Sequence, residues 1–316
     1  MGSAKLSRIV ISEFMDAAAV GSLSSRFDVR YDKDLVDRPR ELAALLAEAD
    51  ALIVRNRTMV DASLIASGPK LRVVGRLGVG LDNIDLHACA VRGILVIPAT
   101  GANAQAVAEY VIAAALLLLR RAYESTPDVA GGRWPRAALS NGRELAGKTL
   151  GLIGFGGIGR LTGKLARALG MRAIGFDAHI PPSSALWSDE ATTPRSFAQA
   201  IAEVDVVSLH VPLTPATRNL MDAPRIATMK HDAMLINTSR GGVVDEAALA
   251  DALRARRLGG AALDVFEREP LPAGSPLEGC PNLLLTPHIA GVTRESNERV
   301  SSLIADKVAQ ALTVGS

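Results

Sequence analysis

Short apolar runs alternate along most of the chain with longer segments whose apolar residues recur at helical spacing. The short runs are rich in β-branched residues, which is typical of strands buried on both faces of a parallel sheet. Over the first hundred residues, the expected strands are Arg8–Ser12, Val29–Tyr31, Ala51–Arg55, Leu71–Gly75 and Ile94–Ile97. The helices expected between them are Met15–Phe27, Arg38–Ala49, Asp61–Ser67 and Asn83–Arg92. This order predicts a parallel sheet with helices on both faces.

A second alternating series begins at Lys148, after a long helical segment, Ala102–Arg121, and a less regular stretch around Gly131–Gly142. Its expected strands are Thr149–Phe155, Arg172–Phe176, Asp205–Val211, Ala233–Asn237, Gly260–Val265 and Asn282–Thr286. Its expected helices are Ile158–Leu169, Ser196–Val204, Pro224–Met229, Asp245–Arg256 and a final amphipathic helix, Thr293–Leu312. We therefore expect an α/β fold with two doubly wound parallel-sheet domains.

The composition indicates a globular chain that binds neither nucleic acid nor membranes. With 316 residues the chain is long enough for two domains, and 48% hydrophobic with 22% charged residues is a globular profile. A net charge of +2 gives little attraction to polyanions, and 3% aromatic residues argue against base stacking. Ala106–Leu119 is almost wholly apolar, but it is too short to span a bilayer and carries Glu109.

The two cysteines, Cys89 and Cys280, are far apart in the sequence. Neither has a cysteine or histidine at metal-ligand spacing, so we expect reduced thiols in a cytoplasmic protein and no metal site. The candidate chemistry therefore rests on other residues.

A glycine-rich pattern marks the start of the second series. Gly154, Gly156 and Gly159 form G-x-G-x-x-G, with Gly157 and Ile158 before the last glycine. Such a pattern also occurs in ordinary turns, but here it ends an expected strand and opens a helix, which is the context of a dinucleotide site. The first glycine allows a tight turn, the second lets the backbone approach a pyrophosphate, and the third permits close helix packing. The pyrophosphate would then lie at the positive end of the helix dipole.

Asp177 follows the next expected strand and completes the unit. A carboxylate here accepts hydrogen bonds from ribose hydroxyls and repels the 2′-phosphate of NADP, so we expect NAD. Ala178 stands where an NADP enzyme would carry arginine, whereas the imidazole of His179 could accommodate a phosphate. The helix opened by the glycines has its apolar positions at Leu161, Leu165 and Leu169.

Three further segments follow successive expected strands of the second series. They are Asn237–Gly242, Asp264–Pro270 and Thr286–Gly291. Because ligands bind at the carboxyl ends of strands in open α/β sheets, these segments would bring Arg240, several carboxylates and His288 to one edge. This set can supply a carboxylate clamp, a proton-transfer group and an acid that orients it.

Each of these residues also has a structural interpretation. Arg240 could be a surface or capping arginine, and His288 could be a hydrogen-bonded core histidine. Glu269 could be a loop carboxylate, and Asp264 could cap a strand end. Their joint placement beside a dinucleotide motif favours the catalytic interpretation.

On these motifs the chain resembles the D-isomer-specific 2-hydroxyacid dehydrogenases, and within them the phosphoglycerate dehydrogenase branch. The resemblance runs from about Ala51 to Ser301. The matching segments are Ile53–Arg55, Gly75–Asn83, Gly154–Gly159, His210–Leu213, Arg240–Gly242 with Asp245 and Glu246, Asp264–Pro270, and Pro287 with His288. The resemblance implies an oxidoreductase that interconverts a 2-hydroxy acid and its 2-oxo acid by hydride transfer with NAD.

The resemblance also implies the site residues. It implies that Arg240 binds the substrate carboxylate, that His288 is the acid/base group, and that Glu269 is its partner carboxylate. The implied cofactor-binding residues are Val79, Gly154, Gly156, Gly157, Ile158, Gly159, Asp177, His210, Val211, Pro212, Thr238, Ser239, Arg240, Asp264, His288, Ala290 and Gly291. The implied substrate-binding residues are Arg55, Asn56, Leu77, Gly78, Val79, Arg240 and His288.

The family's fold implies two domains, the first of them discontinuous. Residues 1–100 with 292–316 would form a flavodoxin-like substrate domain, and residues 101–291 a Rossmann NAD-binding domain. The segment Ala102–Arg121 resembles the family's dimer-forming helix, which implies a homodimer.

The residues after the third expected strand bear on the substrate. Arg55 and Arg57 indicate a second anionic group, such as phosphate or sulfonate, although Arg57 could face solvent because neighbouring residues alternate faces. Asn56 stands where the phosphoglycerate enzymes commonly carry a small hydroxyl residue. Ile11–Asp16 and Arg55–Thr58 resemble the corresponding segments of bacterial sulfolactate dehydrogenases. The candidate substrates are therefore 3-phosphoglycerate, sulfolactate, and glyoxylate or hydroxypyruvate.

A binding protein is the competing class. The C-terminal binding protein corepressors, which sense NADH, resemble the same family and keep similar catalytic residues. No extended tail with interaction motifs is expected here, which favours the enzyme.

Overall fold

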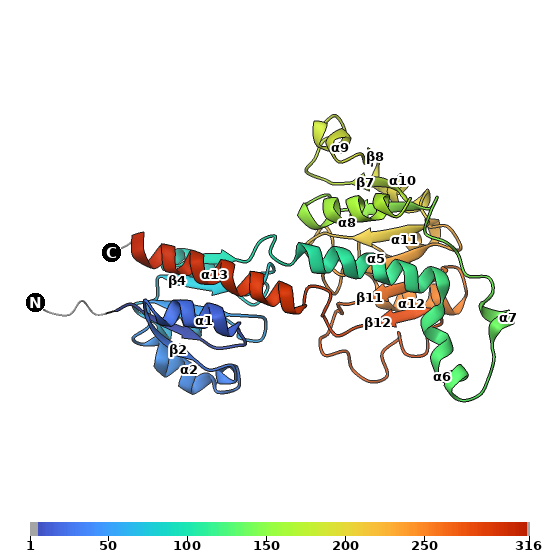
Figure 1. The fold of residues 1–316 in the computed structure, drawn as a ribbon. Helices are drawn as coiled ribbons and strands as arrows, with labels where there is room; N and C mark the ends of the chain where they lie inside the picture. Colours follow the sequence, from blue (N-terminus) through green and yellow to red (C-terminus); the bar gives the residue numbers. More distant parts are fainter. Residues whose placement is uncertain (1–5, 315–316) are drawn as a thin grey trace, which may run out of the picture. The chain divides into compact units, whose positions relative to one another are not determined.

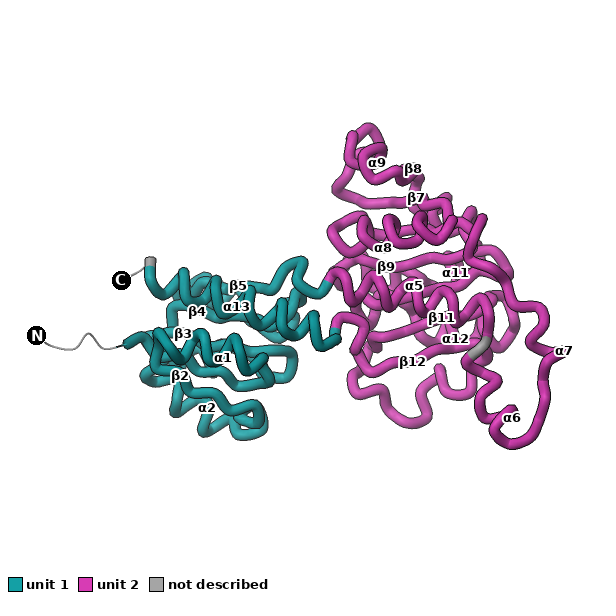
Figure 2. Tube along the Cα trace, in the orientation of Figure 1, with its two compact units in different colours: residues 1–103, 292–316 teal, residues 104–291 magenta. Residues whose placement is uncertain are grey.

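The computed structural model describes residues 6–314 and divides into two compact units (Figure 2). Unit 1 comprises Met1–Asn103 and Val292–Ser316, and unit 2 comprises Ala104–Gly291. Residues 1–5 and 315–316 of the expected substrate domain lie outside the described residues. Each unit contains one parallel sheet, which confirms the expected fold class.

Unit 1 contains a five-stranded parallel sheet in the order β2-β1-β3-β4-β5 (Figure 1). Its strands are β1 (Arg8–Ile11), β2 (Asp28–Tyr31), β3 (Ala51–Val54), β4 (Val73–Arg76) and β5 (Leu95–Pro98). Its helices are α1 (Ala17–Ser24), η1 (Leu35–Asp37), α2 (Pro39–Leu46), α3 (Ala62–Ser67), α4 (Leu86–Val91) and α13 (Arg294–Val314). Ile9 and Ile11 pack with α1 and α13, whereas Val10 packs with α2, α3 and α4. Helices therefore cover both faces of this sheet.

The last helix of the chain, α13, packs on β4 of unit 1. A Cβ at Gly75 in β4 would lie 2.8 Å from Cγ2 of Ile304 and 2.9 Å from Cγ2 of Val308. Both of these side chains are fully buried. A glycine in the strand thus lets the helix lie close to the sheet, and it explains why the end of the chain belongs to the first unit.

Unit 2 contains a seven-stranded parallel sheet in the order β12-β11-β10-β9-β6-β7-β8 (Figure 1). Its strands are β6 (Thr149–Ile153), β7 (Arg172–Phe176), β8 (Thr193–Pro194), β9 (Val206–Leu209), β10 (Met234–Asn237), β11 (Gly260–Leu263) and β12 (Leu283–Leu285). Its helices are α5 (Ala104–Arg120), η2 (Ala122–Ser125), α6 (Thr126–Ala130), α7 (Arg136–Leu139), α8 (Gly157–Ala168), α9 (Ala185–Asp189), α10 (Phe197–Ala202), α11 (Ala223–Thr228) and α12 (Glu246–Arg254).

The strand order of unit 2 reverses beside β6. The chain runs from β6 through β7 to β8 at one edge, returns to β9, and continues through β10 and β11 to β12 at the other edge. In open α/β sheets, ligands bind at the carboxyl ends of the strands next to such a reversal. The topology therefore predicts a ligand-binding site at the carboxyl ends of β6 and β9.

Most expected elements are shorter in the structure, and several helices begin later because the residue before them is a capping residue. α1 begins at Ala17, since the Asp16 side chain accepts the N–H of Ala18, and Asp85 caps α4 in the same way. The elements β8, α6, α7, α9, η1 and η2 were not expected. None of these six is longer than five residues, which is too short for a periodic pattern.

The buried face of α8 differs from the expected one. Leu161 and Leu165 are only partly buried and Leu169 is 45% exposed, whereas Gly163 and Ala166 are buried. A Cβ at Gly163 would lie 3.0 Å from a leucine side chain of β6, and α8 also packs against α5. Small residues face the sheet because the helix lies close to it, and of the three leucines Leu165 packs at the margin of the core.

The apolar run noted in the sequence lies in α5, which packs against α8 and the sheet of unit 2. Its buried residues include Val111, Ala115 and Leu118. Among the residues that the structure describes, no helix combines the length and the apolar character needed to cross a membrane.

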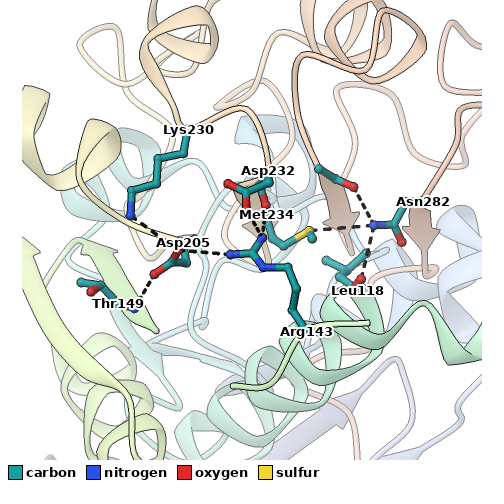
Figure 3. Close-up of polar contacts among 9 residues, drawn as sticks. Leu118, Arg143, Thr149, Asp205, Lys230, Asp232, Met234 and Asn282 are labelled. Atoms are coloured by element: carbon teal, nitrogen blue, oxygen red, sulfur yellow. Dashed lines mark hydrogen bonds and ion pairs between the residues drawn. The ribbon is translucent and has the colours of Figure 1, made fainter. Parts of the chain in front are cut away.

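Polar side chains join the amino ends of the strands in unit 2 (Figure 3). The Asp205 carboxylate, just before β9, accepts hydrogen bonds from the N–H of Thr149 (2.8 Å) and from Nη2 of Arg143 (3.1 Å). Arg143 also pairs with Asp232 at 3.0 Å, and Nζ of Lys230 lies 3.5 Å from Asp205. These ion pairs fix the segment after α7 at the edge of the sheet opposite the expected site.

Asn282 makes a second set of polar contacts at this edge, just before β12. Its Nδ2 donates to the carbonyls of Gly259 (2.7 Å) and Leu118 (3.3 Å). The Tyr123 hydroxyl donates to its Oδ1 at 3.0 Å. One buried amide therefore joins the end of α5 and η2 to the start of β12.

Candidate active site

Three neighbouring strands of unit 2 end together at the carboxyl edge. β10, β11 and β12 are parallel, with Asn237 in register with Leu263 and Leu263 in register with Leu285. The loops that follow carry Arg240, Glu269 and His288. The first residues of these three loops therefore lie next to one another at the carboxyl edge of the sheet.

His288 is paired with Glu269. Nδ1 of the ring lies 2.8 Å from Oε2 of Glu269, whose other oxygen accepts the N–H of Phe266 at 3.0 Å. The side chains of His288 and Glu269 are 43% and 36% exposed, so the ring is accessible to a ligand. Because a carboxylate is a hydrogen-bond acceptor, Nδ1 is the donor in this pair, and Nε2 is the ring nitrogen left available to a ligand.

The backbone of His288 adopts a left-handed conformation, with φ of 57°. Its N–H donates to the carbonyls of Asp264 (2.8 Å) and Thr286 (3.0 Å). This conformation is uncommon outside glycine, and such residues concentrate at functional sites where the surroundings hold them.

Asp264 holds the loop that carries His288. Its side chain is 1% exposed, and Oδ1 accepts the N–H of Ile289 (2.8 Å) and the hydroxyl of Thr286 (2.6 Å). Oδ2 accepts the N–H of Ala290 at 2.8 Å. The carboxylate is therefore engaged with the neighbouring loop after β12, and a contact between Asp264 and the cofactor stays a prediction.

Arg240 lies in a turn held by Asn237. Oδ1 of Asn237 accepts the N–H (3.0 Å) and the hydroxyl (2.7 Å) of Ser239, and its Nδ2 donates to the Arg240 carbonyl at 2.9 Å. A Cβ at Gly241 would lie 1.7 Å from a carbonyl oxygen of the loop that carries Glu269. The turn of Arg240 therefore packs directly on that loop.

In the glycine turn after β6, two glycines pack closely against backbone atoms and two have free space beside them. Gly154 has φ of 95°, and a Cβ there would lie 2.4 Å from the His210 carbonyl oxygen. A Cβ at Gly159 would lie 2.2 Å from the Gly154 carbonyl oxygen. By contrast, a Cβ at Gly156 or Gly157 would meet no atom within 4 Å. Open backbone at the start of α8 is the arrangement that a pyrophosphate requires.

The segment after β9 packs against this turn. Nε2 of His210 lies 2.9 Å from the Ser208 hydroxyl, and burial lowers the pKa of His210 to about 4. A Cβ at Gly154 would lie 3.1 Å from Cγ1 of Val211, whereas Pro212 is exposed. His210 is thus neutral at physiological pH and supports the turn by packing, without adding charge for the cofactor phosphates.

Asp177 joins the end of β7 to the glycine turn. Its Oδ2 accepts the N–H of Phe155 and its Oδ1 that of His179, both at 2.8 Å. The residue is partly exposed, so each oxygen keeps a lone pair for a ribose hydroxyl. Oγ1 of Thr238 is buried and has no hydrogen-bond partner among the described residues. Open glycines, an acceptor carboxylate and an unpaired hydroxyl fit NAD.

The expected substrate residues of unit 1 follow β3 and β4. Arg55 is partly buried and its Nη2 donates to Oδ1 of Asn297 at 2.9 Å, whereas Asn56 is exposed. The Leu77 side chain is 3% exposed and belongs to the core, Gly78 is also buried, and Val79 is partly buried.

Two polar residues with clear structural roles were not among the expected site residues. Tyr110 of α5 donates to the Thr286 hydroxyl at 2.5 Å, because that hydroxyl donates in turn to Asp264. Glu13 is buried directly after β1. A charged residue after a buried strand is a signal that could have indicated Glu13, whereas nothing in the apolar pattern of α5 distinguishes Tyr110.

Comparison with known proteins places this site in a family. Residues 112–290 match the model of the D-isomer specific 2-hydroxyacid dehydrogenase, NAD binding domain. The (S)-sulfolactate dehydrogenase of Chromohalobacter salexigens is 53% identical over 98% of this chain and 99% of its own length. The D-3-phosphoglycerate dehydrogenase of Mycobacterium leprae is 38% identical over 96% of this chain, which spans 56% of that protein.

Among solved structures, the TT0316 protein of Thermus thermophilus superposes with a TM-score of 0.88. It is 35% identical, and the match covers 97% of both chains. With the glycine turn, the paired His288 and Glu269, and the family match in view, the chain belongs to the D-isomer specific 2-hydroxyacid dehydrogenases, which are NAD-dependent oxidoreductases.

Proposed function

We propose that the protein interconverts a doubly anionic 2-hydroxy acid and its 2-oxo acid, with sulfolactate as the favoured substrate. The observation that carries this proposal is the 53% identity, over nearly all of both chains, to a protein named (S)-sulfolactate dehydrogenase. Arg55 and Arg57 of unit 1 supply the positive charge that a sulfonate requires. 3-Phosphoglycerate is the second candidate, because its phosphate presents similar charge and phosphoglycerate dehydrogenases are relatives of the chain.

The proposed roles in unit 2 follow from its geometry. The glycine turn and Asp177 would hold NAD, which would supply the hydride acceptor for oxidation and, as NADH, the hydride donor for reduction. Arg240 binds the substrate carboxylate through two parallel hydrogen bonds, which fixes the orientation of C2. Nε2 of His288 takes the hydroxyl proton during oxidation and returns it during reduction. Glu269 holds Nδ1, so the ring keeps one orientation in both directions.

The proposed cofactor preference is NAD over NADP. The Asp177 carboxylate lies beside the glycine turn and carries negative charge where the 2′-phosphate of NADP would bind. Ala178, which follows it, offers no positive charge to offset that repulsion.

The proposed assembly is a homodimer formed through α5. Leu116 and Leu117 of this helix are 42% and 36% exposed, and Trp134 in the segment after it is 77% exposed. Exposed apolar side chains grouped along one part of the chain are typical of a surface that another protein covers.

The proposed compartment is the cytoplasm. Cys89 is buried and Cys280 is partly buried, and both are unpaired in the structure. Free thiols are typical of a reducing compartment, where the NAD pool used by such an enzyme is also found.

The test is NADH oxidation by the purified protein with 3-sulfopyruvate, 3-phosphohydroxypyruvate, hydroxypyruvate, glyoxylate and pyruvate, repeated with NADPH. We expect kcat/KM to be highest with 3-sulfopyruvate and NADH. A preference for a singly charged acid would contradict the proposed substrate class, and equal rates with NADPH would contradict the role of Asp177.

A further inference from the structure

In unit 1, the segment after β1 contacts the segment after β3, and the two strands are parallel neighbours. Glu13 follows β1 and is 4% exposed. Its Oε1 accepts the N–H groups of Arg55 (2.9 Å) and Thr58 (3.0 Å). Its Oε2 accepts those of Asn56 (3.3 Å) and Arg57 (3.1 Å). One buried carboxylate therefore binds four successive N–H groups of the loop 55–58.

The carbonyl groups of the same loop are bound from another side. Nδ2 of Asn83, which is also buried, donates to the carbonyls of Arg55 (3.3 Å) and Thr58 (2.7 Å). The hydroxyls of Ser12 and Thr58 are 2.9 Å apart. The loop backbone is therefore held by buried side chains, and its own side chains are left to face ligands or solvent.

The loop presents two guanidinium groups in defined places. Arg55 lies over the ring of Phe14, with 5.8 Å from its Cζ to the ring centroid, and bonds to Asn297. Arg57 forms an ion pair with Asp37, and both of these side chains are more than half exposed. These are the groups proposed above to bind the second anionic group of the substrate.

The charge of Glu13 works against that binding. Burial raises its pKa, but the N–H groups of the loop outweigh burial and keep the pKa below its ordinary value, so the group is ionised. An anion beside Arg55 and Arg57 weakens their attraction for an anionic substrate. A benefit from Glu13 must therefore come from the geometry that it imposes on the loop.

We propose that Glu13 is a positioning residue for substrate binding, which holds the loop 55–58 so that Arg55 and Arg57 meet the second anionic group. The inference rests on the proposed function, because it assumes that this loop binds the substrate. It assigns Glu13 no contact with the reacting atoms.

The first test is Glu13→Gln, which removes the charge and places an NH₂ group against backbone N–H groups. We expect KM for 3-sulfopyruvate to rise by about tenfold or more, because two hydrogen bonds of the loop are lost. We expect kcat and the Kd for NADH to stay within about threefold, since the acid/base pair is on unit 2. KM for glyoxylate, which lacks the second anionic group, is expected to change least.

Whether KM for 3-sulfopyruvate rises or falls distinguishes a positioning role of Glu13 from a purely electrostatic one. If Glu13 acted only through its charge, Glu13→Gln would lower KM for an anionic substrate, and Glu13→Asp would leave it unchanged. Under the proposal both variants raise it, because the shorter aspartate cannot reach all four N–H groups. A lower KM for Glu13→Gln, or an equal loss with glyoxylate and 3-sulfopyruvate, would overturn the proposal.

Asp61→Asn is the matched control. Asp61 lies on the same connection, and its side chain caps α3 by accepting the N–H of Leu64 at 2.8 Å. Its variant should keep the KM for 3-sulfopyruvate.

Hydrogen exchange of the amides of residues 55–58 supplies a readout that does not depend on turnover. Faster exchange in Glu13→Gln is expected, and unchanged exchange would overturn the proposal. If the unaltered protein reduces no doubly anionic 2-oxo acid, the proposed function fails instead, and the exchange result still reports on the loop.

Discussion

Polar residues that follow neighbouring strands of the sheet can have different roles, and their hydrogen-bond partners distinguish these roles. Asp264, which follows β11, is buried and its carboxylate accepts three hydrogen bonds from the loop after β12. His288, in that loop, is 43% exposed and uses Nδ1 on Glu269. The first residue can therefore maintain geometry, whereas the second can exchange a proton with a ligand.

His288→Gln tests the acid/base role. Glutamine keeps a polar side chain but cannot transfer a proton, so we expect kcat to fall by about 10²–10⁴-fold. The Kd for NADH, measured by fluorescence titration, should stay unchanged. His231→Gln is the control, because His231 is exposed and precedes the amino end of β10, whereas the loops of the site follow the carboxyl ends of the strands. A His288→Gln variant with normal kcat would exclude the assignment.

His210 predicts a pH dependence of stability. Its pKa is about 4 in the folded protein, against an ordinary value of 6.5, so the unfolded chain binds the proton more readily. Its contribution to stability is therefore complete above pH 6.5, is lost as the pH falls from 6.5 towards 4, and amounts to about 3 kcal/mol.

Urea unfolding across this pH range measures the effect. The free energy of unfolding should fall more steeply below pH 6.5 in the unaltered protein than in His210→Asn. Parallel curves for the two proteins would contradict the burial of a neutral ring.

At the scale of elements, the turn between β6 and α8 uses its glycines for different purposes. Gly159 allows the helix to contact the backbone of the turn, whereas Gly156 faces open space. The same residue type thus serves packing at one position and access for a ligand at the other.

Gly156→Ala and Gly159→Ala separate these two purposes. A Cβ at Gly159 would lie 2.2 Å from a carbonyl oxygen, so we expect a clear loss of thermal stability and of NADH binding. A Cβ at Gly156 meets nothing within 4 Å, so we expect an unchanged Tm and a Kd for NADH raised by about tenfold. Thermal unfolding and NADH titration of both variants measure this. A Gly159→Ala variant as stable as the unaltered protein would contradict the packing argument.

At the scale of the whole molecule, α5 has two different sides. Val111, Ala115 and Leu118 are buried against the rest of unit 2, while Leu116 and Leu117 remain exposed. The two exposed leucines are the residues through which the proposed dimer would form.

Leu117→Glu tests the proposed dimer. A buried carboxylate in an apolar interface is unfavourable, so the variant should sediment as a monomer where the unaltered protein sediments as a dimer. Leu86→Glu is the control, because Leu86 is 48% exposed on α4 of unit 1 and should not alter the assembly. A monomeric unaltered protein would rule out the proposal.

Much of the fold could be predicted from the sequence because its signals are local. Strand and helix periodicity, the glycine turn and the residues that follow each strand depend on neighbours within one element. For this reason β7 was predicted at its full length, Arg172–Phe176, and Arg240, Glu269 and His288 were located on adjacent strand ends. Helices of five residues or fewer span less than two turns, which is too short for a recognisable helical period, and α6, α7 and α9 were missed for that reason.

Other properties depended on contacts between distant parts of the chain. The sequence by itself determined the class of fold, the dinucleotide motif and the type of chemistry, because these depend on residue type and short-range spacing. Only the tertiary structure decided that small residues form the buried face of α8, and that Asp264 is engaged with the loop that carries His288. It also decided that Glu13 binds a loop 42 to 45 residues away. The physical reason is that helix approach and hydrogen-bond satisfaction depend on which groups meet after folding.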